Sequence, residues 1–317
     1  MGKKSSTKSI TTRVSGTESA VLTKPNLGLV CQTNSSAVRY RQATMKRFAS
    51  LTMDDQVQML RDLYRDNLKS FFSAIDFCTE QKINLYRMPS SIFPFSDIEI
   101  GRRVLQEFEN ELAQAGVQAT QRGIRIVAHP DQFVVLSSDS ESVIANSVVV
   151  LEMHSMIFDM LQQPRSAWNA ITLHGGKRGN SDVLLRSIDR LSDGVRTRLV
   201  LENDEMSYSS EDILQVCLSS GVPMIFDAHH HLVKEKSENY DCPSISHYVD
   251  AARTTWAPNE SWQLVHISNG AEHLHDRRHS DIVTMMPKAY SRVPWIEVEA
   301  KGKEEAVAYL ANNWLNQ

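Results

Sequence analysis

Short β-branched runs alternate along the chain with longer amphipathic stretches whose apolar residues recur at helical spacing. The runs predict eight strands, at 27–32, 83–88, 125–129, 170–174, 198–203, 223–227, 262–268 and 295–300. The stretches between them predict helices, for example over 54–81, 101–122, 141–162 and 303–315. Eight parallel strands, each followed by helix, close into a barrel. The expected fold is therefore α/β, a single (β/α)8 TIM barrel.

The ends of these elements set the expected domain limits. Residues 1–24 are rich in Ser, Thr and Lys and have almost no large apolar side chains, which predicts a disordered tail before a barrel domain over 25–317. Four glycines stand near predicted helix ends, where left-handed capping geometry favours this residue: Gly116, Gly123, Gly194 and Gly221.

Composition narrows the class of protein. The sequence shows no apolar run of the roughly 18 residues that a membrane span requires, and no apolar signal-peptide core. The four cysteines are far apart and form no CxxC pair, so neither a disulfide framework nor a zinc ribbon is indicated. We therefore expect a soluble intracellular protein, cytoplasmic or associated with the nucleoid, with no membrane partner.

Candidate chemistry appears where the predicted strands end. Strands three to eight stop near six ligand-type residues: His129, His174, Glu202, Asp227, His266 and Glu299. In a TIM barrel these ends converge on the face that carries the active site. Carboxylates gathered there repel one another and need cations or protons. A His/Asp/Glu set without thiolate suits Mn²⁺, Zn²⁺ or Mg²⁺, and the imidazoles favour manganese or zinc.

Two loops extend this set. Asp227 begins the run DAHHH, in which His230 could serve a neighbouring ion, whereas three consecutive histidines cannot all face one way. The seventh loop, 268–281, is long and polar and carries Arg277 and His279. A site with several metals and bridging carboxylates activates hydroxide and stabilises both the attacking and the leaving oxygen of a phosphodiester.

The first loop has a charge pattern that suits DNA. Between Glu18 and Asp54 there is no acidic residue. The basic and aromatic residues of this stretch are Lys24, Arg39, Tyr40, Arg41, Lys46, Arg47 and Phe48. Such a stretch can contact phosphates and stack on bases, and a solvated basic loop is the alternative. We single out Arg39, Tyr40 and Arg41 as DNA-binding candidates.

Nine segments resemble the UV damage endonucleases, a family of xylose-isomerase-like barrels related to endonuclease IV. They are LGLVC (27–31), LYRMPSSIFPF (85–95), AHPDQF (128–133), LHGGKRGN (173–180), LVLENDE (199–205), MIFDAHHH (224–231), LVHISNG (264–270), RRHSDI (277–282) and VEAKGKE (298–304). The resemblance covers nearly all of the chain beyond the tail. It implies a DNA repair enzyme that nicks the damaged strand 5′ to UV photoproducts and other distorting lesions.

The resemblance also implies roles for individual residues. One ion would be held by His129, His174 and Glu202, a second by Glu202, Asp227, His266 and Glu299, and a third with help from His230 and His279. Glu202, His230 and Glu299 are the expected catalytic residues, and Gln132 and Phe133 the probes inserted at the lesion. Lys177 and Arg277 are expected to contact DNA. The cluster would hold two or three divalent ions, Mn²⁺ first and Zn²⁺, Mg²⁺ or Co²⁺ as alternatives, in a monomer acting on damaged double-stranded DNA.

Some features keep other functions open. Ser91 and Leu264 stand where bacterial members of the family have a histidine and a lysine, so the fine mechanism and the lesion range can differ. A sugar isomerase or epimerase on the same barrel would also bind two divalent ions, although it has no use for an exposed Gln132–Phe133 pair. A non-catalytic damage-binding protein would leave the metal ligands as buried charges without a partner.

Overall fold

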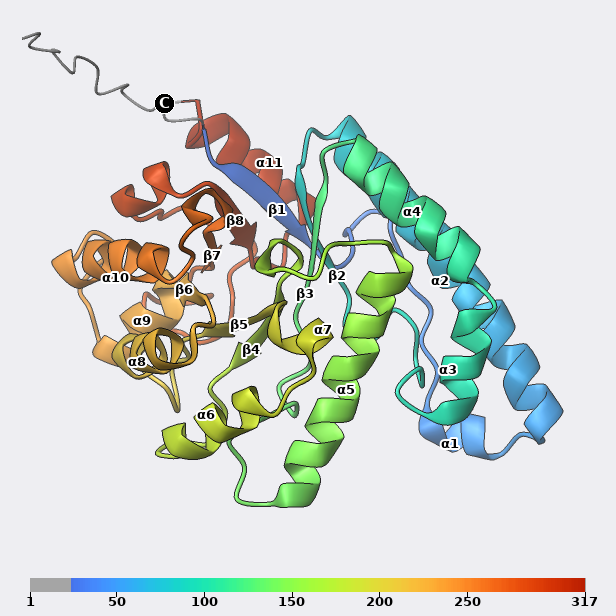
Figure 1. Ribbon diagram of the computed structural model, residues 1–317. Coiled ribbons are helices and arrows are strands. Elements are labelled where there is room, and N and C mark those ends of the chain that lie inside the picture. Colours follow the sequence, from blue (N-terminus) through green and yellow to red (C-terminus); the bar gives the residue numbers. More distant parts are fainter. Residues whose placement is uncertain (1–23, 317) are drawn as a thin grey trace, which may run out of the picture.

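A computed structural model describes residues 24–316 and contains a closed barrel of eight parallel strands in the order β1 to β8 (Figure 1). The predicted fold class is confirmed. Of the predicted tail, all residues but Lys24 lie outside the described part. Lys24 itself donates from Nζ to Oδ1 of Asn316, 3.1 Å away, near the other end of the chain.

The elements have the following bounds. The strands are β1 (Asn26–Val30), β2 (Leu85–Met88), β3 (Arg125–Ala128), β4 (Ile171–His174), β5 (Leu199–Glu202), β6 (Met224–Asp227), β7 (Leu264–Ile267) and β8 (Trp295–Val298). The α-helices are α1 (Met45–Ala49), α2 (Met53–Glu80), α3 (Glu99–Gln106), α4 (Glu109–Gln121), α5 (Glu141–Met160), α6 (Ser181–Asp189), α7 (Asp193–Arg196), α8 (Ser210–Ser220), α9 (Ala228–Glu235), α10 (Pro243–Thr254) and α11 (Glu304–Asn313). Three 3₁₀ turns are η1 (Ala167–Asn169), η2 (Glu260–Trp262) and η3 (Lys288–Arg292).

Each predicted strand overlaps an observed one, but the helix predicted over 101–122 is wrong as a single element. It is divided into α3 and α4 at Phe108, whose backbone leaves helical geometry at φ −104° and ψ 14°. The break turns the Phe108 ring inward, where it is buried and meets Tyr64 edge to face at 6.4 Å. Burial of this aromatic ring therefore overrides the continuous helical pattern.

The barrel interior is layered because alternate residues of each strand point inward. At the end where the strands begin, the Arg125 guanidinium is buried against the rings of Trp168, Trp256 and Trp295, at 4.7, 5.8 and 5.3 Å. Above it lies an apolar layer made by Leu85, Val127, Val200, Ile225 and Leu264. Two residues further along each of these strands, the inward side chains become polar or charged. The functional layer is therefore the one at the strand ends.

Two of the four glycine assignments are confirmed and two are wrong. Gly123 and Gly221 have positive φ, 69° and 72°, at helix ends. Gly116 instead lies within α4, where an added Cβ would overlap the carbonyl oxygen of Leu161 at the end of α5. Gly194 lies in α7, where a Cβ would come 2.7 Å from Oγ of Ser155. Both permit close packing against α5.

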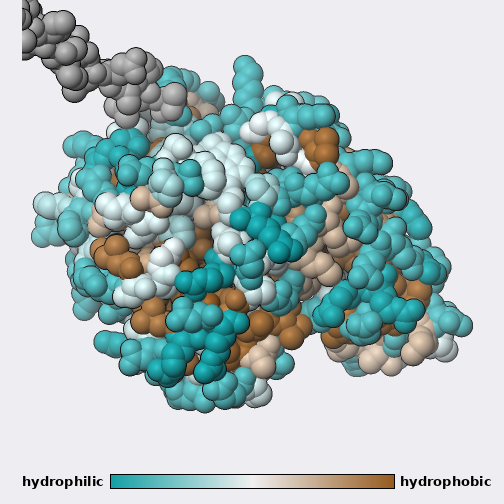
Figure 2. All heavy atoms as spheres, in the orientation of Figure 1, coloured by the Kyte–Doolittle hydropathy of each residue, from teal (hydrophilic) through white to brown (hydrophobic). Residues whose placement is uncertain are grey.

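By length and composition alone, helix α5 is long and apolar enough to cross a membrane, the one such helix among residues 24–316. This differs from the expectation drawn from the sequence. The helix packs against α4 and α7 in the outer ring of the barrel, and it buries eight residues, among them Leu151, Ile157 and Phe158. The surface in Figure 2 is hydrophilic over most of the face shown, with apolar side chains in scattered patches. Part of its apolar surface is therefore covered by the rest of the barrel.

Candidate metal centre

The six ligand-type residues predicted at the strand ends come together at one mouth of the barrel. His174, Glu202 and Asp227 are the last residues of β4, β5 and β6. His129 follows β3 directly, His266 is the third residue of β7, and Glu299 follows β8. Parallel strands in register place these positions at the same level of the barrel, as the pairing of Asp227 with His266 shows.

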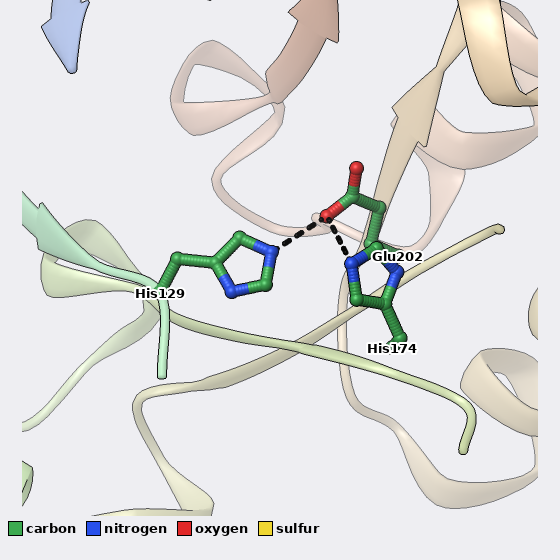
Figure 3. Close-up of side chains that lie close together, drawn as sticks. All are labelled: His129, His174 and Glu202. Carbon is green, nitrogen blue, oxygen red and sulfur yellow. Dashed lines mark hydrogen bonds and ion pairs between the residues drawn. The ribbon is translucent and has the colours of Figure 1, made fainter. Parts of the chain in front are cut away.

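Glu202 is the hub of this arrangement. Its carboxylate is fully buried, and Oε2 lies 3.1 Å from Nε2 of His129 and 3.9 Å from Nε2 of His174 (Figure 3). The other oxygen, Oε1, lies 2.9 Å from Nδ1 of His266 and 3.4 Å from Nδ1 of His230. One carboxylate therefore faces imidazoles from four different elements, which is the geometry of a bridging ligand.

Ligand atoms lie close enough to hold an ion in three overlapping groups. These are His129, His174 and Glu202; Glu202, Asp227 and His230; and Asp227, His266 and Glu299, with the atoms of each group within 4.8 Å of one another. The first group has the membership expected from the resemblance. The second expected group is divided between the other two, so Asp227 as well as Glu202 is shared.

The chemistry of these donors fits divalent cations. Nδ1 of His129 is hydrogen-bonded to the Pro130 carbonyl at 3.0 Å, and its Nε2 lies 3.1 Å from Oε2 of Glu202. Oδ2 of Asp227 is buried and has no hydrogen-bond partner within the described chain. In metal sites, the ring nitrogen that does not bind the metal is commonly hydrogen-bonded to a carbonyl or carboxylate. A buried carboxylate oxygen without a hydrogen-bond partner is also typical of such sites, because burying it without a cation costs free energy.

Electrostatics in the site are dominated by the mixture of carboxylates and imidazoles. Burial alone would raise the pKa of Glu202, but the imidazoles of His266 and His174 hold that pKa well below its ordinary value. Burial would lower the pKa of His266, whereas the carboxylates of Glu202 and Glu297 raise it to about 10. The site therefore holds ionised carboxylates whose charge is balanced by protons on imidazole, and a metal ion would displace those protons.

The three consecutive histidines divide as expected, with one in the site. His230, in the first turn of α9, faces Glu202 and donates from Nδ1 to the Asn203 carbonyl at 3.0 Å. His229 is buried and bonded to Tyr240 and to the Asp276 carbonyl, at 2.7 and 2.9 Å. His231 is buried between the hydroxyls of Ser210 and Ser244. The two outer histidines therefore hold α9 in place.

The mouth opens into a cavity of about 970 Å³, lined by loops from all around the barrel. His279 lies on its wall but belongs to none of the three groups found among residues 24–316. His279 therefore lies beside the centre, and its expected contribution to a third ion stays a prediction.

Sequence reasoning missed two buried charges beneath the mouth. Arg87 on β2 donates from Nε and Nη2 to Oε1 and Oε2 of Glu297 on β8, at 2.8 and 2.9 Å. Nη2 of Arg87 also lies 2.6 Å from Oε1 of Glu299. Two signals could have found them: an arginine inside the apolar run INLYRM, and a carboxylate two residues before Glu299 on the same face of a strand.

Comparisons with known proteins agree with this geometry. The model of the family described as UV-endonuclease UvdE matches residues 25–316. The chain belongs to the UV-endonuclease UvdE family. A UV DNA damage endonuclease of Nostoc sp. is 45% identical over 294 residues, covering 92% of this chain and 91% of its own. One from Deinococcus radiodurans is 45% identical over 289 residues, covering 90% and 94%.

Solved structures share the fold with this chain at lower identity. The crystal structure of SacUVDE aligns with a TM-score of 0.72 at 21% identity, over 90% of this chain and 98% of that one. A D-psicose 3-epimerase from Clostridium cellulolyticum H10 aligns with a TM-score of 0.52 at 9% identity, over 87% and 85%. Both likenesses show a shared barrel fold. The fold alone therefore does not separate nucleases from sugar epimerases.

The residues expected to probe DNA in a UvdE protein differ in exposure. Gln132 and Phe133 are exposed on the loop after β3, with Phe133 69% accessible and Gln132 on the cavity wall. Tyr40 also lines the cavity, but its hydroxyl is hydrogen-bonded to that of Tyr86 at 2.7 Å. Phe48 is buried and stacked on Phe95, so its assignment to a DNA-stacking stretch is wrong.

The cations expected to contact phosphate are exposed, and each is bonded within the protein. Arg41 pairs with Asp66, and Lys177 pairs with Asp139. Arg277, on the cavity wall, pairs with Glu205 at 2.5 Å. Arg39 donates to the Asn34 carbonyl. Exposed ion pairs contribute only about 0–1 kcal/mol, so a phosphate can replace the carboxylate at small cost.

The two residues expected to depart from the family pattern have different surroundings. Ser91 lies on the cavity wall. Leu264 is buried in the apolar layer, two residues before His266 on β7. The leucine therefore continues the hydrophobic floor beneath the candidate ligands.

Proposed function

We propose that the protein is a metal-dependent endonuclease that nicks DNA on the 5′ side of UV photoproducts and other distorting lesions. The observation that carries the proposal is Glu202, a buried carboxylate surrounded by four imidazoles at the mouth of a barrel of the UvdE family. The relatives named UV DNA damage endonuclease, 45% identical over nine-tenths of the chain, support it.

The roles that we propose for individual residues follow from the three ligand groups. His129, His174 and Glu202 would hold one ion, and Asp227, His266 and Glu299 another, with His230 adjoining both. Divalent ions bound there would activate water and stabilise charge on the phosphodiester oxygens. The exposed cations around the cavity would bind the DNA backbone, and Phe133 would enter the duplex at the lesion. Manganese is the preferred ion because imidazoles and carboxylates are mixed.

A nicking assay on supercoiled plasmid tests the proposal. Irradiated plasmid should be relaxed in the presence of Mn²⁺, and unirradiated plasmid should be relaxed much more slowly. Binding without nicking would indicate the damage-binding alternative. Absence of both, together with turnover of a ketose, would indicate the epimerase alternative.

Phe133→Ala is expected to reduce discrimination between damaged and intact DNA. Stacking of an aromatic side chain on a base contributes about 1–3 kcal/mol, so selectivity should fall by roughly tenfold. The wedge costs less where the duplex is already distorted, so mildly distorting lesions should lose most and an abasic site least. Relative nicking rates on these substrates measure the effect. Tyr309→Ala, a partly exposed aromatic on α11, is the control. Unchanged selectivity in Phe133→Ala would place recognition elsewhere, for example in the seventh loop.

Replacing Arg39 and Arg41 together with alanine is expected to weaken binding to damaged and intact duplex alike. The slope of log affinity against log salt should decrease by about 0.9 for each phosphate that the variant no longer neutralises. Arg122→Ala is a matched control, because Arg122 also forms an exposed pair, with Asp76, but just before β3 at the opposite end of the barrel. A slope equal to that of the wild type would show that these arginines do not contact the backbone.

A further inference from the structure

Among the arginines and lysines that line the mouth cavity, Lys303 alone has no partner within residues 24–316. The other two are Arg87, which is paired with Glu297, and Arg277, which is paired with Glu205. The Lys303 ammonium forms no hydrogen bond or ion pair in the described chain, although the residue is half-buried. An ammonium has three N–H donors and no acceptor. Those of Lys303 are therefore available to an anion that enters the cavity.

The backbone of Lys303 has a conformation that residues other than glycine rarely adopt, with φ 47° and ψ −117°. Its neighbours hold this conformation from two sides. The Glu304 carboxylate accepts from two backbone N–H groups of the first loop, at 2.8 and 2.9 Å. The N–H groups of Lys301 and Gly302 donate to carbonyls of the seventh loop, at 3.0 and 2.9 Å. Strained residues that are held so firmly cluster at binding and active sites.

Lys303 lies where the mouth cavity adjoins a second hollow of about 370 Å³. The two share four wall residues: Arg87, His279, Glu299 and Lys303. Burial raises the pKa of the nearby Cys31 thiol, and the positive charges of Arg87 and Lys303 oppose that rise. The charge of Lys303 is therefore felt inside the mouth. A DNA strand with one phosphodiester at the candidate ligands could continue past this residue into the second hollow.

We propose that Lys303 binds a phosphate of the cleaved strand beside the metal centre. The proposal rests on the proposed endonuclease function and adds a substrate-binding residue to it. A compact ammonium charge with three donors suits a phosphate oxygen. The exposed cations Arg41, Lys177 and Arg277 must each release a carboxylate before they bind phosphate, whereas Lys303 has none to release. The backbone on either side of Lys303 is held in advance, so little ordering is needed when the strand binds.

The salt dependence of DNA binding tests this contact without turnover. A lesion-containing duplex already nicked at the proposed cleavage site cannot be cut there again, so protein supplied with Mn²⁺ can be titrated with it at equilibrium. Lys303→Ala should lower the slope of log affinity against log salt by about 0.9, the value for one phosphate contact, and Lys303→Arg should keep the wild-type slope. An unchanged slope in Lys303→Ala would overturn the proposal. Wild-type protein that neither binds nor nicks irradiated DNA would contradict the endonuclease function itself.

Glycine at this position gives a second test, because it removes the ammonium and relieves the backbone together. Lys303→Gly should unfold at a temperature a few degrees above that of Lys303→Ala, which keeps the Cβ. Both variants should nick irradiated plasmid about 10–100-fold more slowly than the wild type, the range for loss of a hydrogen bond between charged groups. The glycine variant therefore tests the contact even if the alanine variant folds poorly.

Lys82→Gly is the matched control for the effect of glycine. Lys82 also has a positive φ, 57°, but it lies just beyond α2, where the chain enters the strand-start end of the barrel. Lys82→Gly should raise the unfolding temperature and leave nicking unchanged. Wild-type nicking by Lys303→Gly would reject the phosphate contact. A Lys303→Gly variant no more stable than Lys303→Ala would overturn the argument from strain.

Discussion

Replacing Glu202 with glutamine is expected to reduce nicking of irradiated plasmid by about a thousandfold, equivalent to ~4 kcal/mol in the activation barrier. Each oxygen of the Glu202 carboxylate faces a different pair of imidazoles, so the carboxylate would be shared between two ions. A neutral amide keeps the shape of the side chain but offers only one oxygen and no charge. Bound metal, measured by elemental analysis, should fall together with the rate.

Two controls separate this effect from general damage to the site. Glu205→Gln changes a carboxylate three residues away, which pairs with Arg277 and belongs to none of the ligand groups of residues 24–316, and it should cost less than tenfold. Wild-type protein treated with EDTA should lose activity and regain it with Mn²⁺. Near-normal nicking by Glu202→Gln would contradict a centre with several metals.

Gly116→Ala is expected to destabilise the protein by about 2 kcal/mol or more, although alanine is the better helix former. Helix propensity alone favours alanine by ~1 kcal/mol. The new methyl group, however, would overlap the carbonyl oxygen of Leu161, and overpacking of this kind commonly costs about 1–3 kcal/mol or more. Because the overlap is between a Cβ fixed to the backbone of α4 and a backbone carbonyl at the end of α5, it can be relieved only if the two helices separate.

A buried amide ties the same crossing together. Nε2 of Gln163, just beyond α5, donates to the carbonyls of Gly116 and Leu161, at 3.2 and 3.0 Å, so separation of the helices would strain the bond to Gly116. The midpoint of urea unfolding measures the effect, with Gln114→Ala on the exposed face of α4 as the control. A stabilised Gly116→Ala variant would show that propensity prevails and that the crossing is loose.

The ring of candidate ligands could be predicted from the sequence because it depends on two regular features. Strands alternate with helices, and a parallel barrel brings all strand ends to one face. His174, Glu202 and Asp227 are each the last residue of a strand. A prediction of where these strands end therefore also predicts the positions of these candidate ligands. His266 and Glu299 lie within two residues of a strand end, and small errors in the boundaries did no harm.

The pair of Arg87 and Glu297 could not be predicted in this way. The two residues are 210 positions apart, on strands β2 and β8 that flank β1. Whether two charges meet inside the barrel depends on which distant strands its closure brings together, and the pattern along a single strand does not record that. The same holds for Phe48 and Tyr40, whose burial is set by distant partners.

The tryptophans at the end of the barrel where the strands begin provide an internal spectroscopic reporter. Trp168, Trp256 and Trp295 surround the Arg125 guanidinium, and Trp262 packs on Trp168 with ring centroids 5.8 Å apart. An apolar layer separates these four indoles from the mouth, and the fifth tryptophan, Trp314, follows α11. Their fluorescence emission therefore follows the integrity of the barrel and is insulated from events at the mouth. A variant with altered metal or DNA binding but native emission is damaged at its site and intact in its fold.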